Sequence, residues 1–347
     1  MYTEYFKFSG LPFQLTPDAR FFFGSAGHSK AMAHLTYGLG QGEGFIIITG
    51  EIGAGKTTIV EHLFQQLDSK KYVAARITNT QLGADDTLRM VASAFGINQE
   101  GADKATLLRR FETFLTRIHQ QGQRALLVID ECQNLSVPAL EELRMLSNLQ
   151  VQGKTPLQSF LVGQPQFRDT LAREELDQLR QRVIASYHLG PIDQAETRRY
   201  IEHRLRTVGW NDNPRFSDAV FEAIYRHTGG VPRKINTLCS RLLLFAFLEE
   251  RQQLGEGDVD AVARDLAEEL NRVLPPQGNG AAAGAMNGAA HAAAPNGAVP
   301  NGAAANGAAN AEILERLSVL ESYVRSHDKT IRRVLKIASD YLEGRRP

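Results

Sequence analysis

Eight residues near the start of the chain have the types and the spacing of a phosphate-binding loop. They read Gly50-Glu51-Ile52-Gly53-Ala54-Gly55-Lys56-Thr57, which matches G-x-x-x-x-G-K-[ST]. In such a loop backbone N–H groups hold phosphate oxygens, the lysine reaches the β- and γ-phosphates, and the hydroxyl binds Mg²⁺. We therefore expect residues 50–58, with Thr58 in the first helical turn, to bind a nucleoside triphosphate, and Thr57 to bind the metal.

A second run, Ala125-Leu126-Leu127-Val128-Ile129-Asp130-Glu131, is an apolar strand that ends in two acids. Asp130 is predicted to hold Mg²⁺, and Glu131 to orient and deprotonate the water that attacks the γ-phosphate. The alternative is that the acids cap the helix expected from Val137-Pro138, but the residues between make such a cap a poor explanation. Because transfer to a bound substrate needs no such glutamate, the pair favours hydrolysis.

Three further polar residues are candidates for contact with the γ-phosphate. Gln164 follows the apolar run 157–162 and could bond the phosphate or the water, or could simply end the strand before Pro165. Arg233 starts a helix after Gly229-Gly230-Val231-Pro232, where a cation is unfavourable unless it has a function. Arg182, or alternatively Arg180, could reach a neighbouring subunit's site, or either could form an internal salt bridge.

The elements that must position these residues follow from hydrophobic patterning. Strand-like runs alternate with helical patterns, which predicts an α/β fold with a parallel five-stranded sheet flanked by helices. The strands are expected at 45–49, 72–78, 125–129, 157–162 and 183–189. The glycine-rich stretch 38–44 is expected to be a plain loop, because it lacks the lysine and precedes the strand.

The rest of the chain divides into three segments of different character. Helical patterns near 193–208, 216–227, 232–250 and 257–272 predict a small all-helical lid. Residues 275–310 are almost wholly Ala, Gly, Asn and Pro, which is typical of a flexible linker. The expected domains are therefore 1–190 (nucleotide-binding core), 191–274 (helical lid), 275–310 (disordered linker) and 311–347.

The last segment carries apolar residues at an unbroken 4-3-4-3 spacing that is typical of a coiled coil. The seam comprises Ile313, Leu317, Leu320, Val324, His327, Ile331, Val334, Ala338 and Tyr341. Self-association through this helix is the favoured interpretation. The alternative is an amphipathic helix that folds back on the rest of the chain.

Composition excludes several classes of protein. The 347 residues carry 39 Lys+Arg and 39 Asp+Glu, so no overall positive charge recruits nucleic acid or an anionic membrane, while a local basic patch stays open. No apolar stretch approaches the roughly 20 residues that span a bilayer. Cys132 and Cys239 are expected to be buried, reduced thiols, and the chain to be cytoplasmic. A peripheral position at the inner membrane, through a partner, stays open.

Taken together, the motifs resemble the AAA+ ATPases of the general secretion pathway protein A (ExeA-like) family over about residues 1–272. Within that family the chain is most similar to the putative secretion ATPases of exosortase/PEP-CTERM exopolysaccharide loci. The resemblance rests on four further runs: Phe8-Ser9-Gly10-Leu11-Pro12-Phe13, Val162-Gly163-Gln164-Pro165, Gln178-Leu179-Arg180-Gln181-Arg182, and Gly229 to Asn236.

This resemblance implies ATP and Mg²⁺ as ligands and residues near Phe23–His28 beside the adenine. It also implies Gln164 as sensor 1, Arg182 as arginine finger of a homo-oligomer, and Arg233 as sensor 2. Membrane-anchored members continue into a transmembrane helix and a cell-wall-binding module, whereas this chain has the linker and the heptad segment. Direct cell-wall binding is therefore not carried over.

The leading hypothesis is an ATPase that assembles or remodels an envelope secretion or exopolysaccharide export system. The first alternative is a DNA-associated regulator that resembles the transposition ATPases, although the zero net charge argues against it. The second is a nucleotide-gated scaffold whose function lies in the coiled coil.

Overall fold

Five parallel strands form the central sheet of the protein, in a computed structural model that describes residues 2–16, 18–78 and 83–273. They are β1 (Phe45–Gly50), β2 (Tyr72–Ile77), β3 (Arg124–Ile129), β4 (Leu157–Gly163) and β5 (Val183–Leu189). Their order is β2-β3-β4-β1-β5, and every neighbouring pair is parallel. The sheet predicted from the sequence is confirmed, and each strand lies within one residue of its expected bounds.

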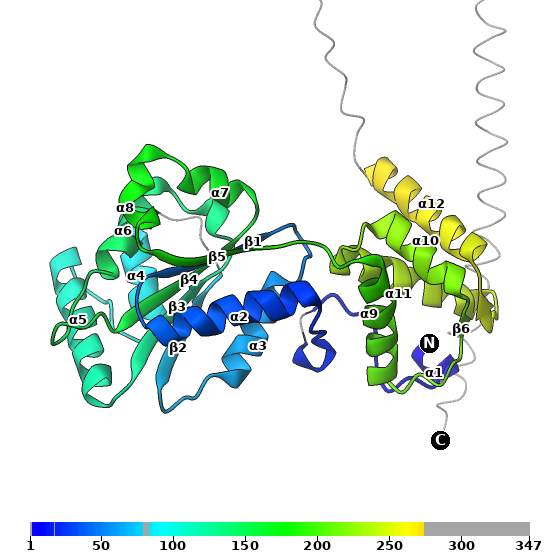
Figure 1. Cartoon of the computed structure of the whole chain (residues 1–347), viewed down its shortest axis with the longest axis horizontal. Coiled ribbons are helices and arrows are strands. Elements are labelled where there is room, and N and C mark those ends of the chain that lie inside the picture. The colour runs from blue at the N-terminus through cyan, green and yellow to red at the C-terminus, as the bar shows by residue number, and fades with distance from the viewer. Residues whose placement is uncertain (1, 17, 79–82, 274–347) are drawn as a thin grey trace, which may run out of the picture. The chain divides into compact units, whose positions relative to one another are not determined.

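Helices cover both faces of this sheet because alternate side chains of each strand point to opposite faces. Ile46 and Ile48 of β1 pack with α2 (Ala26–Gln41) and α3 (Lys56–Gln66). Phe45 and Ile47 belong to the opposite cluster. That face is covered by α4 (Ala84–Ala94), α5 (Lys104–Gln120), α6 (Val137–Leu146), α7 (Gln166–Leu171) and α8 (Asp177–Arg180), with 3₁₀ turns η2 (Cys132–Asn134) and η3 (Glu174–Leu176) (Figure 1).

A helical lid follows the last strand of the sheet. It comprises α9 (Gln194–Thr207), α10 (Asp218–Thr228), α11 (Pro232–Leu248) and α12 (Glu256–Val273), close to the predicted ranges. The prediction that the lid is all-helical is wrong in one detail. Two short strands, β6 (Arg215–Phe216) and β7 (Gln253–Leu254), pair in parallel and tie the starts of α10 and α12 together. Because each strand has only two residues, no alternating pattern marks it in the sequence.

The N-terminal segment, with α1 (Tyr2–Tyr5) and η1 (Ala19–Phe21), packs against the lid (Figure 1). Four buried aromatic rings of this segment share one hydrophobic cluster with lid residues such as Ile201 and Leu242: Phe6, Phe8, Phe13 and Phe21. The predicted domain 1–190 grouped this segment with the sheet. The structure corrects this grouping, because the buried rings of the segment pack with the lid. The apolar faces of α9 and α11 supply the surface that these rings need.

The described residues all belong to the first of two compact units, which comprises residues 1–277, whereas the second comprises residues 278–347. The predicted linker 275–310 and coiled-coil helix 311–347 therefore lie outside the described residues. Among the helices described, none is both long and apolar enough to cross a membrane. Cys132 and Cys239 are buried and unpaired.

The expectation of a loop at 38–44 is wrong for its first half, because α2 continues to Gln41. Gly38 is a packing position within this helix: a Cβ there would lie 1.8 Å from Cδ1 of Ile46, a fully buried side chain of β1. Only glycine lets the helix backbone approach the strand this closely. Gly42, with φ +81°, then ends the helix in the left-handed conformation.

Because of this close contact, we expect alanine substitutions at the two glycines in the last turn of α2 to affect stability differently. Gly38→Ala is expected to lower the free energy of unfolding by about 1–3 kcal/mol, because the new methyl group overpacks the helix–strand contact. Gly40→Ala is the matched control, since a Cβ there meets nothing within 4 Å. It should leave stability unchanged or raise it by about 0.5–1 kcal/mol. Urea denaturation of the full chain measures both, and equal effects would contradict the packing role of Gly38.

Candidate functional site

Three neighbouring strands bring the predicted site residues to one edge of the sheet. β1 leads into the phosphate-binding loop, β3 ends directly before Asp130, and β4 ends directly before Gln164. β4 pairs with β1 on one side and with β3 on the other. Because all are parallel, their carboxyl ends lie at the same edge of the sheet (Figure 1). Ligands bind at this edge in such folds.

The loop has the backbone shape that phosphate binding requires. Gly53 and Gly55 have φ of +83° and +97°, which side-chain-bearing residues rarely adopt. α3 begins at Lys56, immediately after Gly55, so its N-terminus points into the crevice. The loop therefore has the geometry that the prediction needs, and phosphate binding by residues 50–58 stays a prediction.

Lys56 is buried beneath this loop. Its Nζ donates to the carbonyl oxygens of Gly50 (2.8 Å) and Glu51 (3.0 Å). Burial lowers the pKa of Lys56 from its usual value, and the nearby carboxylates of Glu131, Asp130 and Glu51 oppose the shift. A polyphosphate would supply the negative charge that a buried ammonium needs, so the lysine fits this ligand.

Thr57 and Asp130 lie together, as expected for a magnesium site. The Thr57 hydroxyl donates to Oδ2 of Asp130 at 3.2 Å. In the part of the chain that the structure describes, no group of three or more His, Cys, Asp or Glu residues could hold a metal ion. Mg²⁺ commonly binds through one or two protein oxygens plus substrate phosphates and water. The donor set therefore fits Mg²⁺ bound together with a nucleotide.

Glu131 has an unusual backbone and a tightly placed side chain. Its φ of 55° lies in the left-handed region, which is uncommon for residues other than glycine and is found often at functional sites. Its Oε2 accepts hydrogen bonds from the amides of Gln133 and Gln164, the latter at 3.1 Å. The backbone N–H of Gln164 donates to Oε1 of Gln133 at 2.9 Å. Gln164 and the candidate base are thus part of one hydrogen-bonded cluster.

A cavity of about 350 Å³ opens over the loop, within the usual size range of small-molecule pockets. Its walls come from the loop, the N-terminal segment and the lid. It is lined, among others, by Gly53, Lys56, Thr57, Thr58, Phe22, Phe23, His28, Glu131, Gln164, Arg233 and Asn236. The segment that the family resemblance places beside the adenine therefore lines the same cavity as the phosphate loop.

Arg233 contacts the loop through its backbone and its Cβ. Its N–H donates to the carbonyl oxygen of Gly53 at 3.1 Å. A Cβ on Gly53 would lie 2.3 Å from the Cβ of Arg233, so only glycine permits this approach. The arginine also lines the cavity. Its position beside the phosphate loop is consistent with the predicted role at the γ-phosphate.

Arg180 and Arg182 lie at the opposite end of the sheet from the cavity. Val183, next to Arg182, pairs with Phe45 at the start of β1, whereas Leu189 pairs with Gly50 at its end. Six strand residues separate the two ends by about 20 Å. Arg182 donates to the carbonyl oxygen of Ser147 at 3.2 Å. The structure therefore does not bring either arginine to the cavity of its own chain.

Arg180 is held more firmly than Arg182. Its guanidinium donates to the carbonyl oxygens of Leu171 (2.7 Å) and Arg173 (2.8 Å), and it pairs with Asp177. These contacts brace the turn between α7 and α8. An internal role thus accounts for Arg180, whereas the guanidinium of Arg182 donates hydrogen bonds only to Ser147, at 3.2 and 3.4 Å, within the described residues.

His28 lies behind the phosphate loop, where a Cβ on Gly55 would come within 2.6 Å of its Nε2. Its Nδ1 is 2.7 Å from Oγ of Ser25. Burial lowers the pKa of His28 to about 4, while Glu196 and the Ala54 backbone oppose the shift. The imidazole therefore stays neutral in the folded protein at pH values where an unfolded chain would protonate it.

This depressed pKa predicts a loss of stability in mild acid. Below pH 6.5 the unfolded chain binds a proton at His28 that the folded protein does not bind until about pH 4. The contribution of His28 to the free energy of unfolding therefore falls by about 2 kcal/mol between pH 7 and pH 5. Urea denaturation of His28→Gln should show a correspondingly shallower pH dependence. His34→Gln, at an exposed position of α2, is the control, and identical slopes in all three proteins would contradict this assignment.

Three residues around the site were not predicted from the sequence. Arg76 of β2 donates to Oδ2 of Asp130 at 2.9 Å. Gln133 holds Glu131. Arg204 of α9 lines the cavity and donates to the carbonyl oxygen of Pro12 at 2.6 Å, which ties the N-terminal segment to the lid. Of these three residues, only Arg76 could have been found from the sequence, because it is a charged residue within an otherwise apolar strand.

Comparisons with known proteins agree with this architecture. A family described as "AAA domain" matches residues 39–171. General secretion pathway protein A of Aeromonas hydrophila is 35% identical over 268 residues, which cover 77% of this chain and 49% of that protein. The chain thus spans about half the length of this curated relative.

Solved structures share the fold at low sequence identity. Cdc6p of Pyrobaculum aerophilum aligns with a TM-score of 0.59 and 16% identity over 76% of this chain and 74% of that one. The ORC1 protein of Aeropyrum pernix, solved in complex with DNA, aligns with a TM-score of 0.51 and 15% identity over 72% and 68%. These likenesses show the fold alone.

Proposed function

We propose that the chain is an AAA+ ATPase related to general secretion pathway protein A, to which it is 35% identical over 268 residues, and that it binds ATP with Mg²⁺ and hydrolyses it to ADP and phosphate. The observation that carries this proposal is the placement of Glu131, Lys56 and Thr57 around one cavity. A carboxylate that faces the phosphate loop can activate water, and the buried lysine and helix N-terminus can stabilise the phosphate charge.

Each residue has a separate task in this proposal. The loop amides and Lys56 bind the phosphates, while Thr57 and Asp130 hold Mg²⁺, which would neutralise phosphate charge when bound. Glu131 takes the proton from the attacking water. Gln164, which shares Oε2 of Glu131 with Gln133, orients that water or the γ-phosphate.

Magnesium-dependent ATP turnover by the purified full chain tests the proposal directly. Phosphate release is measured with millimolar ATP, in Mg²⁺ and again in excess EDTA, alongside binding of a fluorescent ATP analogue. We expect turnover only with Mg²⁺. The absence of both turnover and magnesium-dependent nucleotide binding would overturn the proposal, whereas binding without turnover would restrict the protein to a nucleotide-gated scaffold.

We further propose that the active form is a homo-oligomer. Arg182 lies about 20 Å from the cavity of its own chain by strand length, so it can serve hydrolysis only in a neighbouring subunit. Arg233 sits on the phosphate loop from the lid side. We therefore expect the position of the lid to differ between the ATP-bound and the ADP-bound protein. The heptad segment 311–347, outside the described residues, is proposed to strengthen assembly.

The proposed role of the ATP cycle is assembly or remodelling of an envelope secretion system, by a cytoplasmic protein that partners hold at the inner membrane. The similarity to general secretion pathway protein A of Aeromonas hydrophila supports a role in secretion. A more specific proposal is that this system exports exopolysaccharide. It rests on the resemblance to the ATPases of exosortase/PEP-CTERM loci. Pull-down of the chain from its own host, followed by identification of envelope components, tests this role.

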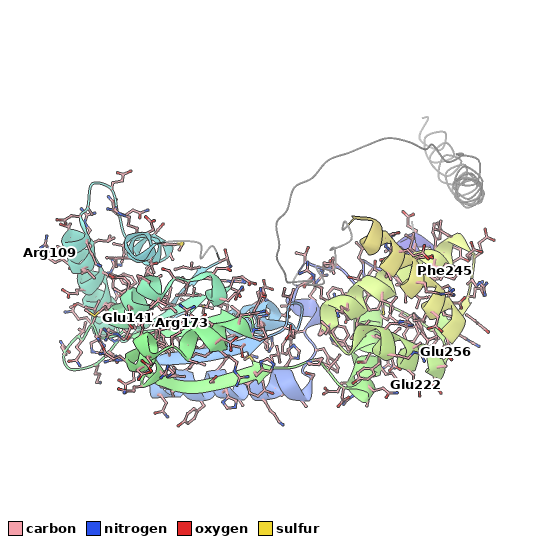
Figure 2. All side chains as sticks on the ribbon, turned by 90° about the horizontal axis from the view of Figure 1, so that it is seen from above. Arg109, Glu141, Arg173, Glu222, Phe245 and Glu256 are labelled. Carbon is pink, nitrogen blue, oxygen red and sulfur yellow. The ribbon has the colours of Figure 1, made fainter. Side chains whose placement is uncertain are left out.

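DNA association is the second candidate, because the fold is shared with the ORC1 protein of Aeropyrum pernix, which was solved in complex with DNA. The charges argue against it: the net charge is zero, and exposed residues of both signs cover the surface, such as Arg109, Arg173, Glu222 and Glu256 (Figure 2). Salt-dependent DNA binding that strengthens with ATP would reverse the ranking.

A further inference from the structure

An arginine of the sheet's edge strand contacts the predicted magnesium site. Arg76 lies in β2 and pairs in register with Val128 of β3, two residues before Asp130. Its side chain is 24% exposed, so most of it is buried, and it lies beside α3. A guanidinium in such a place is stable only beside compensating negative charge.

Two carboxylates supply that charge from different elements. Nη2 of Arg76 lies 2.9 Å from Oδ2 of Asp130, whose side chain is only 5% exposed. Nη1 lies 3.7 Å from Oε1 of Glu61 on α3. The cation thus has one close and one more distant acceptor.

The close acceptor is the same oxygen that faces Thr57. Oδ2 of Asp130 accepts hydrogen bonds from both the Thr57 hydroxyl and Arg76. A metal ion bound by Thr57 and Asp130 therefore competes with the guanidinium for this oxygen. The metal ion and the guanidinium cannot both bind this oxygen strongly unless additional negative charge is present.

We propose that Arg76 is a positioning residue that occupies Asp130 in the nucleotide-free protein and makes divalent-metal binding conditional on bound phosphate. The inference rests on the proposed nucleotide site. A polyphosphate adds the charge and the oxygen ligands that let the metal displace Arg76 from Oδ2. The guanidinium then stays compensated by Glu61, its second acceptor.

The test measures Mn²⁺ binding to the nucleotide-free full chain by electron paramagnetic resonance of the free ion. Wild type is expected to bind Mn²⁺ weakly at the site. Arg76→Gln should bind about tenfold tighter or more, because a positive charge next to the metal is gone. Arg76→Lys keeps the charge and should bind as weakly as wild type.

Two further variants assign any gain to this site. Arg76→Gln combined with Asp130→Asn should return to wild-type affinity, because the carboxylate is lost. Arg144→Gln breaks a partly buried ion pair with Glu141 elsewhere, on α6, and should change nothing. Loss of structure alone would not tighten metal binding, so a gain in Arg76→Gln is specific. Equal Mn²⁺ affinity in wild type and Arg76→Gln overturns the inference.

A second measurement serves if Arg76→Gln does not fold. In Glu61→Gln the arginine loses its alternative acceptor and should hold Asp130 more strongly. The Mn²⁺ concentration needed to support binding of a fluorescent ADP analogue should then rise several-fold, and an unchanged requirement overturns the inference. None of these measurements needs hydrolysis. A protein that shows the Mn²⁺ effects but no turnover would refute the proposed ATPase activity and leave this inference standing.

Discussion

Glu131→Gln is expected to lower the rate of ATP hydrolysis by about 10²–10⁴-fold while nucleotide binding is retained. The carboxylate faces the cavity, and an amide of the same shape cannot take a proton from water. Binding should survive because the loop, Lys56 and Thr57 are untouched. Phosphate release under saturating ATP and titration with a fluorescent ATP analogue measure the two quantities separately.

Two controls decide what a loss of activity means. Glu112→Gln, at an exposed position of α5, should leave turnover unchanged. Lys56→Ala should weaken nucleotide binding, which Glu131→Gln should not. Hydrolysis that survives Glu131→Gln would remove this residue as the base. Simultaneous loss of binding and turnover would show instead that Glu131 holds the loop in shape, as its left-handed backbone would permit.

The parts of the site that follow from local patterns could be predicted from the sequence. The roles proposed for Gly53, Gly55 and Lys56 depend on backbone shape and a short reach, so the spacing within one loop is sufficient to place these residues. Asp130 could be placed beside Thr57 because both follow parallel strands whose carboxyl ends share an edge. The sheet itself followed from apolar runs bounded by turns.

The parts that depend on packing between distant segments could not be predicted. The contact of Arg76 with Asp130 requires that β2 lies beside β3, an order that strand patterns alone do not determine. Arg204 reaches Pro12 across 192 positions of sequence. In the sequence Gly38 resembled a loop residue, because its contact with Ile46 forms only when α2 packs on β1. In each case tertiary contact overrides the local pattern.

Arg182→Ala is expected to lower turnover by about 10³-fold or more if its guanidinium reaches a neighbour's γ-phosphate, as mobile arginines supplied in trans do elsewhere. The same variant should bind ATP normally, because the residue lies at the far end of the sheet from its own cavity. Arg180→Ala should instead lower stability, because its contacts are to the carbonyl oxygens of Leu171 and Arg173. Turnover and urea denaturation distinguish the two arginines.

Mixing two inactive variants separates a role in trans from every internal role. Glu131→Gln subunits keep Arg182 but lack the base, and Arg182→Ala subunits keep the base but lack the arginine. In a mixed oligomer some sites combine an intact Glu131 with a neighbour's intact Arg182, so turnover should reappear. It should grow with total protein concentration, because these sites form only on association. If no ratio of the two variants restores activity, Arg182 acts within its own chain and the proposed intersubunit site is wrong.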